Sequence, residues 1–216
     1  MPYLSLFFTN PFLLIALLLV FLFALSFHEY AHAQMAAWLG DHTAERMNRL
    51  TLNPFAHIDP LGFLALLFVG FGWAKPVPYN PYNLRFQKWG PVLVAAAGPC
   101  ANLLLGFVSG VLSGYFFLTL GPENLLTIFL TQLSLLNFGL MLFNLIPLPP
   151  LDGSKALLAF LSGPAHASAR ARLESQGPML LLLLILLDSF LPIHLFGWLS
   201  FGAHTLSRFA VSLFFG

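Results

Sequence analysis

The chain has 216 residues, of which 58% are hydrophobic and only 8% are charged, and its formal net charge is +1. A soluble domain usually carries about 25% charged residues, which keep its surface hydrated. This composition excludes an ordinary soluble domain, and we expect lipid to be the main solvent of the folded chain. The few basic residues are scattered along the sequence, which argues against a nucleic-acid-binding protein.

The length and the cysteine content limit the architecture further. The length predicts a single domain over residues 1–216. The single cysteine, Cys100, excludes an internal disulfide and a thiolate-rich metal site, and we expect it to be a small packing residue. The first residues contain no Lys or Arg, so we do not expect a cleavable signal peptide and assign them to the mature protein.

Five apolar stretches follow one another along the chain. A helix that crosses a bilayer needs about 20 apolar residues. The stretches 11–40, 91–120, 124–146 and 178–199 meet this length, although Asp188 and Pro192 interrupt the last one, and the stretch 61–73 is too short. A final segment, 201–215, is predicted to be an interfacial or partly inserted helix. We therefore expect an all-α polytopic membrane protein with about four to six transmembrane helices.

The basic residues predict how these helices are oriented. Cytoplasmic loops carry an excess of Lys and Arg. The loop at 121–124 contains Glu123 and no basic residue, so we place it outside, together with the N-terminus. The stretch 61–73 has basic flanks on both sides and is predicted to be a re-entrant or β-hairpin-like element that enters from the cytoplasmic face of the cell membrane. The basic residues of the three predicted cytoplasmic loops are Arg46, Arg49, Lys75, Arg85, Lys88, Lys155, Arg170 and Arg172.

The first long stretch contains the motif His28-Glu29-x-x-His32. Residues four apart lie on one face of a helix, so both imidazoles can bind one metal ion, and Glu29 can accept a proton from a metal-bound water. Ionisable residues inside a membrane span are energetically costly and usually mark a functional site. The alternative is a buried His/Glu network that only joins helices.

A catalytic zinc site needs a third protein ligand and an open coordination position. The two histidines lie near the cytoplasmic end of their span, and the span 124–146 ends on the same side in prolines 147, 149 and 150. These prolines favour an extended segment that delivers Asp152 to the same depth. The alternative role for Asp152 is to cap a helix over SKALLAF. We favour the ligand role because of this common depth.

Five motifs occur in order between about residues 24 and 155. They are His28-Glu29-x-x-His32, the segments 51–62 and 72–81, Gly98-Pro99-Cys100-Ala101-Asn102, and Asn144-x-x-Pro147-x-Pro149-Pro150-Leu151-Asp152-Gly153. Together they resemble the site-2 protease family of intramembrane zinc metallopeptidases, in its compact bacterial branch. The chain lacks the soluble insertion, similar to a PDZ domain, of larger members. The resemblance implies one metalloprotease domain, with a catalytic core at about 11–155 and C-terminal helices at about 156–216.

The resemblance also implies one Zn²⁺ per chain, held by His28, His32 and Asp152, with Glu29 as the base that activates water. This would be a zinc metalloendopeptidase that hydrolyses peptide bonds in or near transmembrane segments of membrane proteins. Its partners would be such a substrate and the lipid bilayer. The sequence does not indicate an oligomeric state. A metal transporter and an inactive binding protein are the alternatives, and both leave Glu29 without a role.

Two further sets of residues are candidates for substrate contacts. Asn102 and Asn144 are amides on otherwise apolar helices, where they could donate to the oxyanion or only form bonds between helices. The segment 72–79 carries prolines that suit an exposed extended edge, and such an edge could pair with an unwound substrate. Its candidate substrate-binding residues are Gly72, Trp73, Lys75, Pro76 and Val77.

Overall fold

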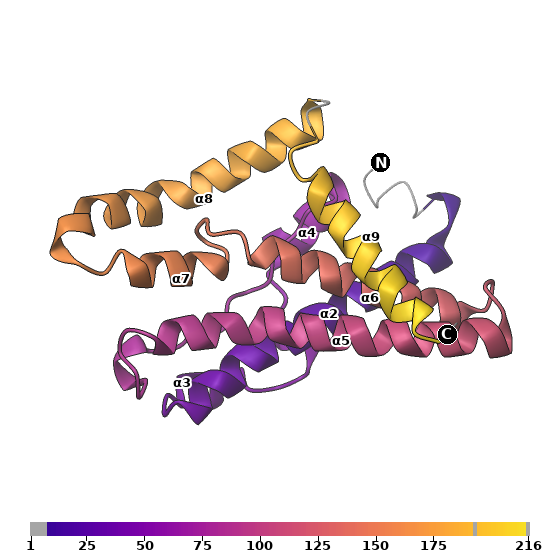
Figure 1. Cartoon of the computed structure of the whole chain (residues 1–216), viewed down its shortest axis with the longest axis horizontal. Helices are drawn as coiled ribbons and strands as arrows, with labels where there is room; N and C mark the ends of the chain where they lie inside the picture. The colour runs from indigo at the N-terminus through magenta and orange to yellow at the C-terminus, as the bar shows by residue number, and fades with distance from the viewer. Residues whose placement is uncertain (1–7, 192–193, 215–216) are drawn as a thin grey trace.

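The computed structural model describes residues 8–191 and 194–214. In this part of the chain the regular structure is entirely helical, as predicted (Figure 1). The α-helices are α2 (Pro11–Trp38), α3 (Thr43–Arg46), α4 (Pro60–Val69), α5 (Gly90–Leu120), α6 (Leu125–Asn144), α7 (Gly153–Phe160), α8 (Ala167–Phe190) and α9 (Gly197–Ser212). Short 3₁₀ turns occur at Pro54–Ala56, Pro81–Asn83 and Pro164–His166.

Three of these helices are long and apolar enough to cross a membrane. They are α2 with 28 residues, α5 with 31 and α6 with 20. Local signals in the sequence fix where they start: Asn10 and Asn124 cap α2 and α6 by accepting a hydrogen bond from a main-chain N–H of the first turn. The antiparallel pair α5 and α6 lies against α2 along much of its length (Figure 1). The chain is therefore a helical membrane protein.

The C-terminal part differs from the prediction of one span over 178–199. Helix α8 begins much earlier, at Ala167, continues through Pro178 and ends at Phe190, and α9 begins at Gly197. The first turns of α8 carry Arg170 and Arg172, so its apolar part is short. A total of four to six spans remains a prediction. The expectations for residues 1–7, Pro192 and Phe215 lie outside the described residues.

Small residues of α5 allow α6 and α9 to approach its backbone closely. Gly106, Gly110 and Gly114 repeat every four residues on one face of α5. A Cβ at Gly110 would lie 2.6 Å from the Cβ of Ala210 on α9, and a Cβ at Gly114 would lie 2.5 Å from the carbonyl oxygen of Val211. Membrane helices commonly use small residues in this way, because apolar packing between them depends on close contact.

The segment between α2 and α5 contains helix α4 and one antiparallel bridge. Asp59 caps α4 by accepting a hydrogen bond from Gly62 N at 2.8 Å, and Gly70, with φ of 84°, ends it in the left-handed region. The bridge pairs Ile58 with Ala74. The predicted β-hairpin-like element is therefore not formed. The residues described here contain this isolated bridge and no regular strand. A re-entrant position in a membrane remains a prediction.

The buried carboxylate of Asp41 ties the end of α2 to the segment that leads into α5. It accepts hydrogen bonds from Thr43 Oγ1 at 2.6 Å, Asn80 N at 2.7 Å and Asn83 Nδ2 at 2.9 Å. Burial raises the pKa of this carboxyl, but the hydrogen bonds outweigh burial and hold the pKa below its usual value. The carboxylate thus stays ionised and fixes both loops at the end of the bundle near the histidines.

Candidate metal centre

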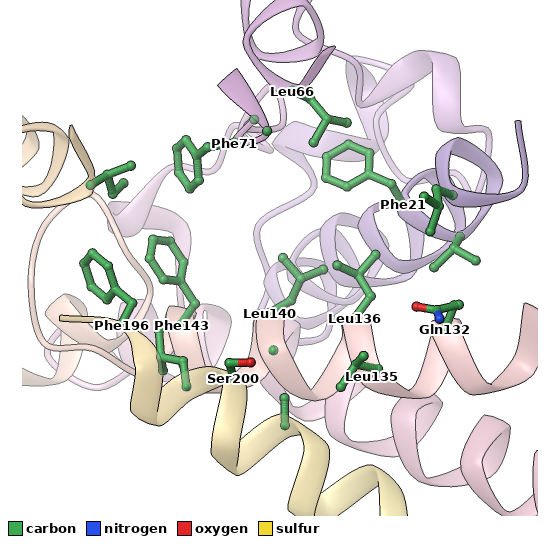
Figure 2. Close-up of a pocket in the computed structure, with 18 of the residues that line it drawn as sticks. Phe21, Leu66, Phe71, Gln132, Leu135, Leu136, Leu140, Phe143, Phe196 and Ser200 are labelled. Carbon is green, nitrogen blue, oxygen red and sulfur yellow. The ribbon is translucent and has the colours of Figure 1, made fainter. Parts of the chain in front are cut away.

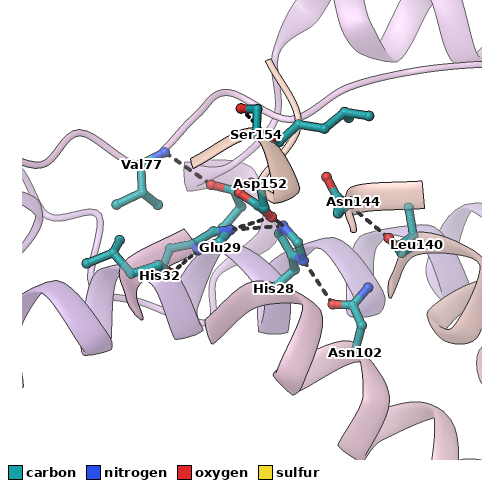
Figure 3. A network of polar contacts seen from close by, with 11 residues as sticks. His28, Glu29, His32, Val77, Asn102, Leu140, Asn144, Asp152 and Ser154 are labelled. Atoms are coloured by element: carbon teal, nitrogen blue, oxygen red, sulfur yellow. Dashed lines mark hydrogen bonds and ion pairs between the residues drawn. The ribbon is translucent and has the colours of Figure 1, made fainter. Parts of the chain in front are cut away.

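The structure brings His28, His32 and Asp152 together, as the sequence predicts (Figure 3). The histidines lie one turn apart on the same face of α2, and their Nε2 atoms are 2.9 Å apart. Asp152 Oδ2 lies 3.2 Å from His28 Nε2 and 3.4 Å from His32 Nε2. Three potential ligand atoms from two distant parts of the chain therefore face one point.

The spacing and the chemistry of these atoms fit a zinc ion. Zinc binds imidazole nitrogen and carboxylate oxygen at about 2.0–2.1 Å in tetrahedral geometry, which places neighbouring ligand atoms about 3.3 Å apart. The three observed separations lie close to that value. Asp152 Oδ2 is also buried and has no hydrogen-bond partner in the described part of the chain. A buried carboxylate oxygen without a donor needs a cation to compensate it.

Helix α5 orients both imidazoles through their other ring nitrogens. His32 Nδ1 lies 2.7 Å from the carbonyl oxygen of Val94, which can only accept, so Nδ1 carries the proton and Nε2 keeps its lone pair. His28 Nδ1 likewise lies 3.0 Å from Asn102 Oδ1, an amide oxygen that can only accept, so this Nδ1 also carries the proton. Partners of this kind commonly fix the tautomer and the orientation of metal-binding histidines. Both Nε2 atoms are thus available as ligands.

Gly98 makes room for the two imidazoles against α5. A Cβ at this position would lie 2.5 Å from His28 Cε1 and would also overlap the His32 ring. Real Cβ atoms do not approach other heavy atoms so closely, and both rings are buried and held by hydrogen bonds. Gly98 is therefore required by the metal site itself, a role that the Gly-Pro-x-Ala-Asn motif did not reveal from the sequence.

Asp152 reaches the histidines from the turn that follows α6. It occupies the residue before α7 but makes no capping hydrogen bond, so the structure does not support the capping role considered for it. Its Oδ2 instead faces the Nε2 lone pairs of both imidazoles, and a cation bound among these three atoms would favour the ionised carboxylate.

Glu29 lies beside the triad and is oriented by the extended segment 72–79. Its Oε2 accepts a hydrogen bond from Val77 N at 3.1 Å (Figure 3). In the described residues, Oε1 has no hydrogen-bond partner. One oxygen thus anchors the carboxylate, and the other is available for proton transfer.

Arg49 and His57 hold this extended segment from its other side, a role of Arg49 that was not predicted from the sequence. The buried Arg49 donates from Nη2 to the carbonyl oxygen of Lys75 at 2.7 Å, and Lys75 N donates to the carbonyl oxygen of His57 at 2.9 Å. His57 is fully buried, and its Nε2 donates to the carbonyl oxygen of Thr51. These bonds set the position of Val77 relative to Glu29.

The other candidate residues lie around the same site. Asn102 is fully buried and contacts His28, which favours an orienting role over contact with the oxyanion. Asn144 Nδ2 donates to the Leu140 carbonyl oxygen at 3.0 Å. A cavity of about 440 Å³ is lined by His28, Glu29, Gly72, Trp73 and Asn144, among others. Five of the predicted residues therefore line this cavity, whereas the candidates Lys75, Pro76 and Val77 do not.

Comparison with known proteins identifies the family. The chain is 40% identical over 185 residues to "Putative zinc metalloprotease YwhC" of Bacillus subtilis, and the match covers 81% of this chain and 80% of the relative. The chain belongs to this zinc metalloprotease family. The relationship agrees with the resemblance to compact site-2 proteases and with the donor set that the structure assembles.

More distant relatives carry similar names. The chain is 30% identical to "Putative zinc metalloprotease Rip2" of Mycolicibacterium smegmatis over 76% of this chain and 64% of the relative. It is 37% identical to "Zinc metalloprotease MJ0392" of Methanocaldococcus jannaschii over 36% of this chain and 22% of the relative. No family model matches the chain. No solved structure matches it.

We predict that Gly98→Ala abolishes zinc binding, because the added methyl group displaces both imidazoles. Zinc per chain, measured by elemental analysis of the purified protein, should fall from close to one to well below one tenth. Gly139→Ala in α6 is the matched control, since its Cβ would meet only Ala203 at 4.0 Å and zinc should be retained. Full zinc content in Gly98→Ala would contradict the close packing described here.

Proposed function

We propose that this zinc metalloprotease is an endopeptidase that cleaves peptide bonds within or beside the membrane-spanning segments of other membrane proteins. His28, His32 and Asp152 hold the zinc ion, and Glu29 is the general base. The protein crosses the cell membrane several times, with the metal site toward the cytoplasmic side and the N-terminus outside. Eight of the nine Lys and Arg residues precede α5 or lie between α6 and the middle of α8, which supports this orientation.

The position of the histidines within α2 carries this proposal. Helix α2 ends at Trp38, and at about 1.5 Å per residue His28 and His32 lie roughly 15 Å and 9 Å along the helix from that end. The hydrocarbon core of a bilayer is about 30 Å thick. A helix that spans it therefore carries its imidazoles below the lipid surface, where soluble polypeptides do not enter.

An apolar cavity provides space for a lipid-soluble substrate next to the triad. Its volume is about 530 Å³, and it lies between α2, α6, α8, α9 and the residues that follow α4 (Figure 2). Phe21, Phe71, Leu140 and Phe143 line both this cavity and the smaller one that contains His28 and Glu29. An apolar segment that enters from the side can thus reach the catalytic residues without crossing a polar surface.

The arrangement suits hydrolysis by an activated water. A zinc ion held by His28, His32 and Asp152 would lower the pKa of a bound water to about 7 and would polarise the carbonyl of the scissile bond. Glu29 accepts a proton from the water as the water oxygen attacks the carbonyl carbon. It then passes the proton to the amide nitrogen, so that the C–N bond breaks and an acid and an amine are released.

The extended segment 72–79 would hold the unwound substrate. The N–H and C=O of Lys75 point toward His57 and Arg49. Because successive residues of an extended chain point these groups to alternate sides, those of Ala74 point away from them. Ala74 lines the cavity that contains Glu29, and in the described residues its N–H makes no hydrogen bond. This edge can pair with a substrate strand.

Asn144 is the better of the two candidates for stabilising the oxyanion. It lines the same cavity as His28 and Glu29, and its amide offers a second N–H besides the one bonded to Leu140. An amide donor placed near the scissile carbonyl would stabilise the negative charge that develops there.

The central test compares the wild-type protein with Glu29→Gln on a single-span substrate in vesicles. The amide cannot accept the proton, so we expect the cleavage rate to fall by about 10²–10⁴-fold while zinc content remains close to one per chain. His28→Ala and Asp152→Ala should lose both zinc and activity. Cleavage by Glu29→Gln at the wild-type rate would rule out the assigned base.

The substrate edge is tested by Ala74→Pro, which removes the main-chain N–H of that residue. We expect kcat/KM for the membrane substrate to fall about tenfold or more, since one paired hydrogen bond to the substrate is lost. Zinc content should not change. Ala74→Ser keeps the N–H and is the matched control. Equal losses in the two variants would show that the side chain, rather than the backbone edge, matters.

A further inference from the structure

A third cavity, distinct from the two beside the metal site, lies at the end of the bundle where α5 begins. Its volume is about 510 Å³, within the range of about 300–1,000 Å³ that is typical of small-molecule sites. Three of its lining residues are cations, namely Lys88 before α5, Lys155 on α7 and Arg170 on α8. These three residues take no part in the catalysis proposed above.

The cavity carries an excess of positive charge. Its one acidic residue, Glu174, is paired with Arg170, whose Nε lies 3.1 Å from Glu174 Oε1. Within the described residues, neither Lys88 nor Lys155 forms an ion pair with a carboxylate. The first turn of α5 also forms part of the wall through Pro91, and the N-terminus of a helix favours an anion. The cavity thus has two ammonium groups available for an anionic ligand.

Aromatic residues beside the cavity indicate where it lies relative to the bilayer. Trp89 packs edge-on against Phe160 with ring centroids 5.6 Å apart, and both side chains are exposed. Lys88 Nζ lies 5.4 Å from the centre of the Trp89 ring. Trp is enriched where a membrane protein meets the lipid headgroups. The end of a spanning helix with such residues lies at headgroup depth.

We propose that this cavity binds the phosphate headgroup of an anionic phospholipid, with Lys88 and Lys155 as its main contacts. Basic pockets between helices on the cytoplasmic side are suited to anionic headgroups. The exposed Trp89 and Phe160 rings can contact the acyl chains of the same lipid. An acidic segment of the substrate would satisfy the charge, but it would leave these two exposed rings without a role.

The bound lipid would also affect catalysis, a consequence that rests on the proposed function. Tyr79 lines the cavity and lies two residues beyond Val77, which orients Glu29. Lys155 lies in the first turn of α7, three residues after Asp152, and its N–H donates to the Asp152 carbonyl oxygen at 3.0 Å. A lipid that fixes Tyr79 and Lys155 would therefore stabilise both sides of the metal site.

The test measures lipid binding without a substrate, so that it does not depend on proteolysis. Native mass spectrometry of the full chain, released from nanodiscs of equal parts phosphatidylglycerol and phosphatidylcholine, should show one retained phosphatidylglycerol. The double variant Lys88→Gln/Lys155→Gln should bind it about 30-fold more weakly, from a factor of about five per basic residue near the surface. The double variant Arg46→Gln/Arg172→Gln removes the same charge from exposed positions outside the cavity and should retain the lipid.

Three outcomes would overturn the lipid site. One is equal retention of phosphatidylglycerol by both double variants. Another is displacement of the lipid by inorganic phosphate, which would identify a site for small anions. The third is unchanged lipid retention with selective loss of cleavage of substrates that carry acidic flanks, which would identify a substrate contact. If phosphatidylglycerol binds as proposed but neither the wild-type protein nor the variants cleave a membrane substrate, the lipid site stands and the proposed function falls.

Discussion

Asp152 Oδ2 and the Nε2 atoms of His28 and His32 face one another at 2.9–3.4 Å, and both imidazoles have their Nδ1 protons directed elsewhere. Three sets of lone pairs, one of them on an anion, repel one another in a buried site unless a cation lies among them or a ring takes up a second proton. Neighbouring residues either hold these ligands in place or make room for them.

Helix α5 is the main support of the site. One stretch of this helix supplies the Val94 carbonyl and the Asn102 side chain that orient the rings, and Gly98 between them leaves the space that the rings occupy. Further along, the small residues of the same helix bring α9 and α6 into contact with it. The metal site is therefore supported by the packing of α5 against α2, whereas the extended segment 72–79 is positioned by hydrogen bonds to Arg49 and His57 in the preceding loop.

The sequence predicts those features that depend on local spacing. The pair His28 and His32 follows from helical periodicity. Asp152 was predicted from the common depth of two chain segments. The sequence did not predict Gly98 or Arg49, because their roles arise from contacts between residues distant in the chain. The C-terminal span over 178–199 was predicted from an apolar stretch, whereas α8 begins earlier, at Ala167, and ends at Phe190, and α9 begins at Gly197.

The most direct test of the metal site is the zinc X-ray absorption spectrum of the wild-type protein and of Asp152→Cys. The wild-type spectrum should show two imidazoles and additional light ligands at about 2.0–2.1 Å. The variant should add one sulfur at about 2.3 Å, because the thiolate replaces the carboxylate at the same position. A wild-type spectrum with fewer than two imidazoles, or a zinc-loaded variant without sulfur, would contradict coordination by His28, His32 and Asp152.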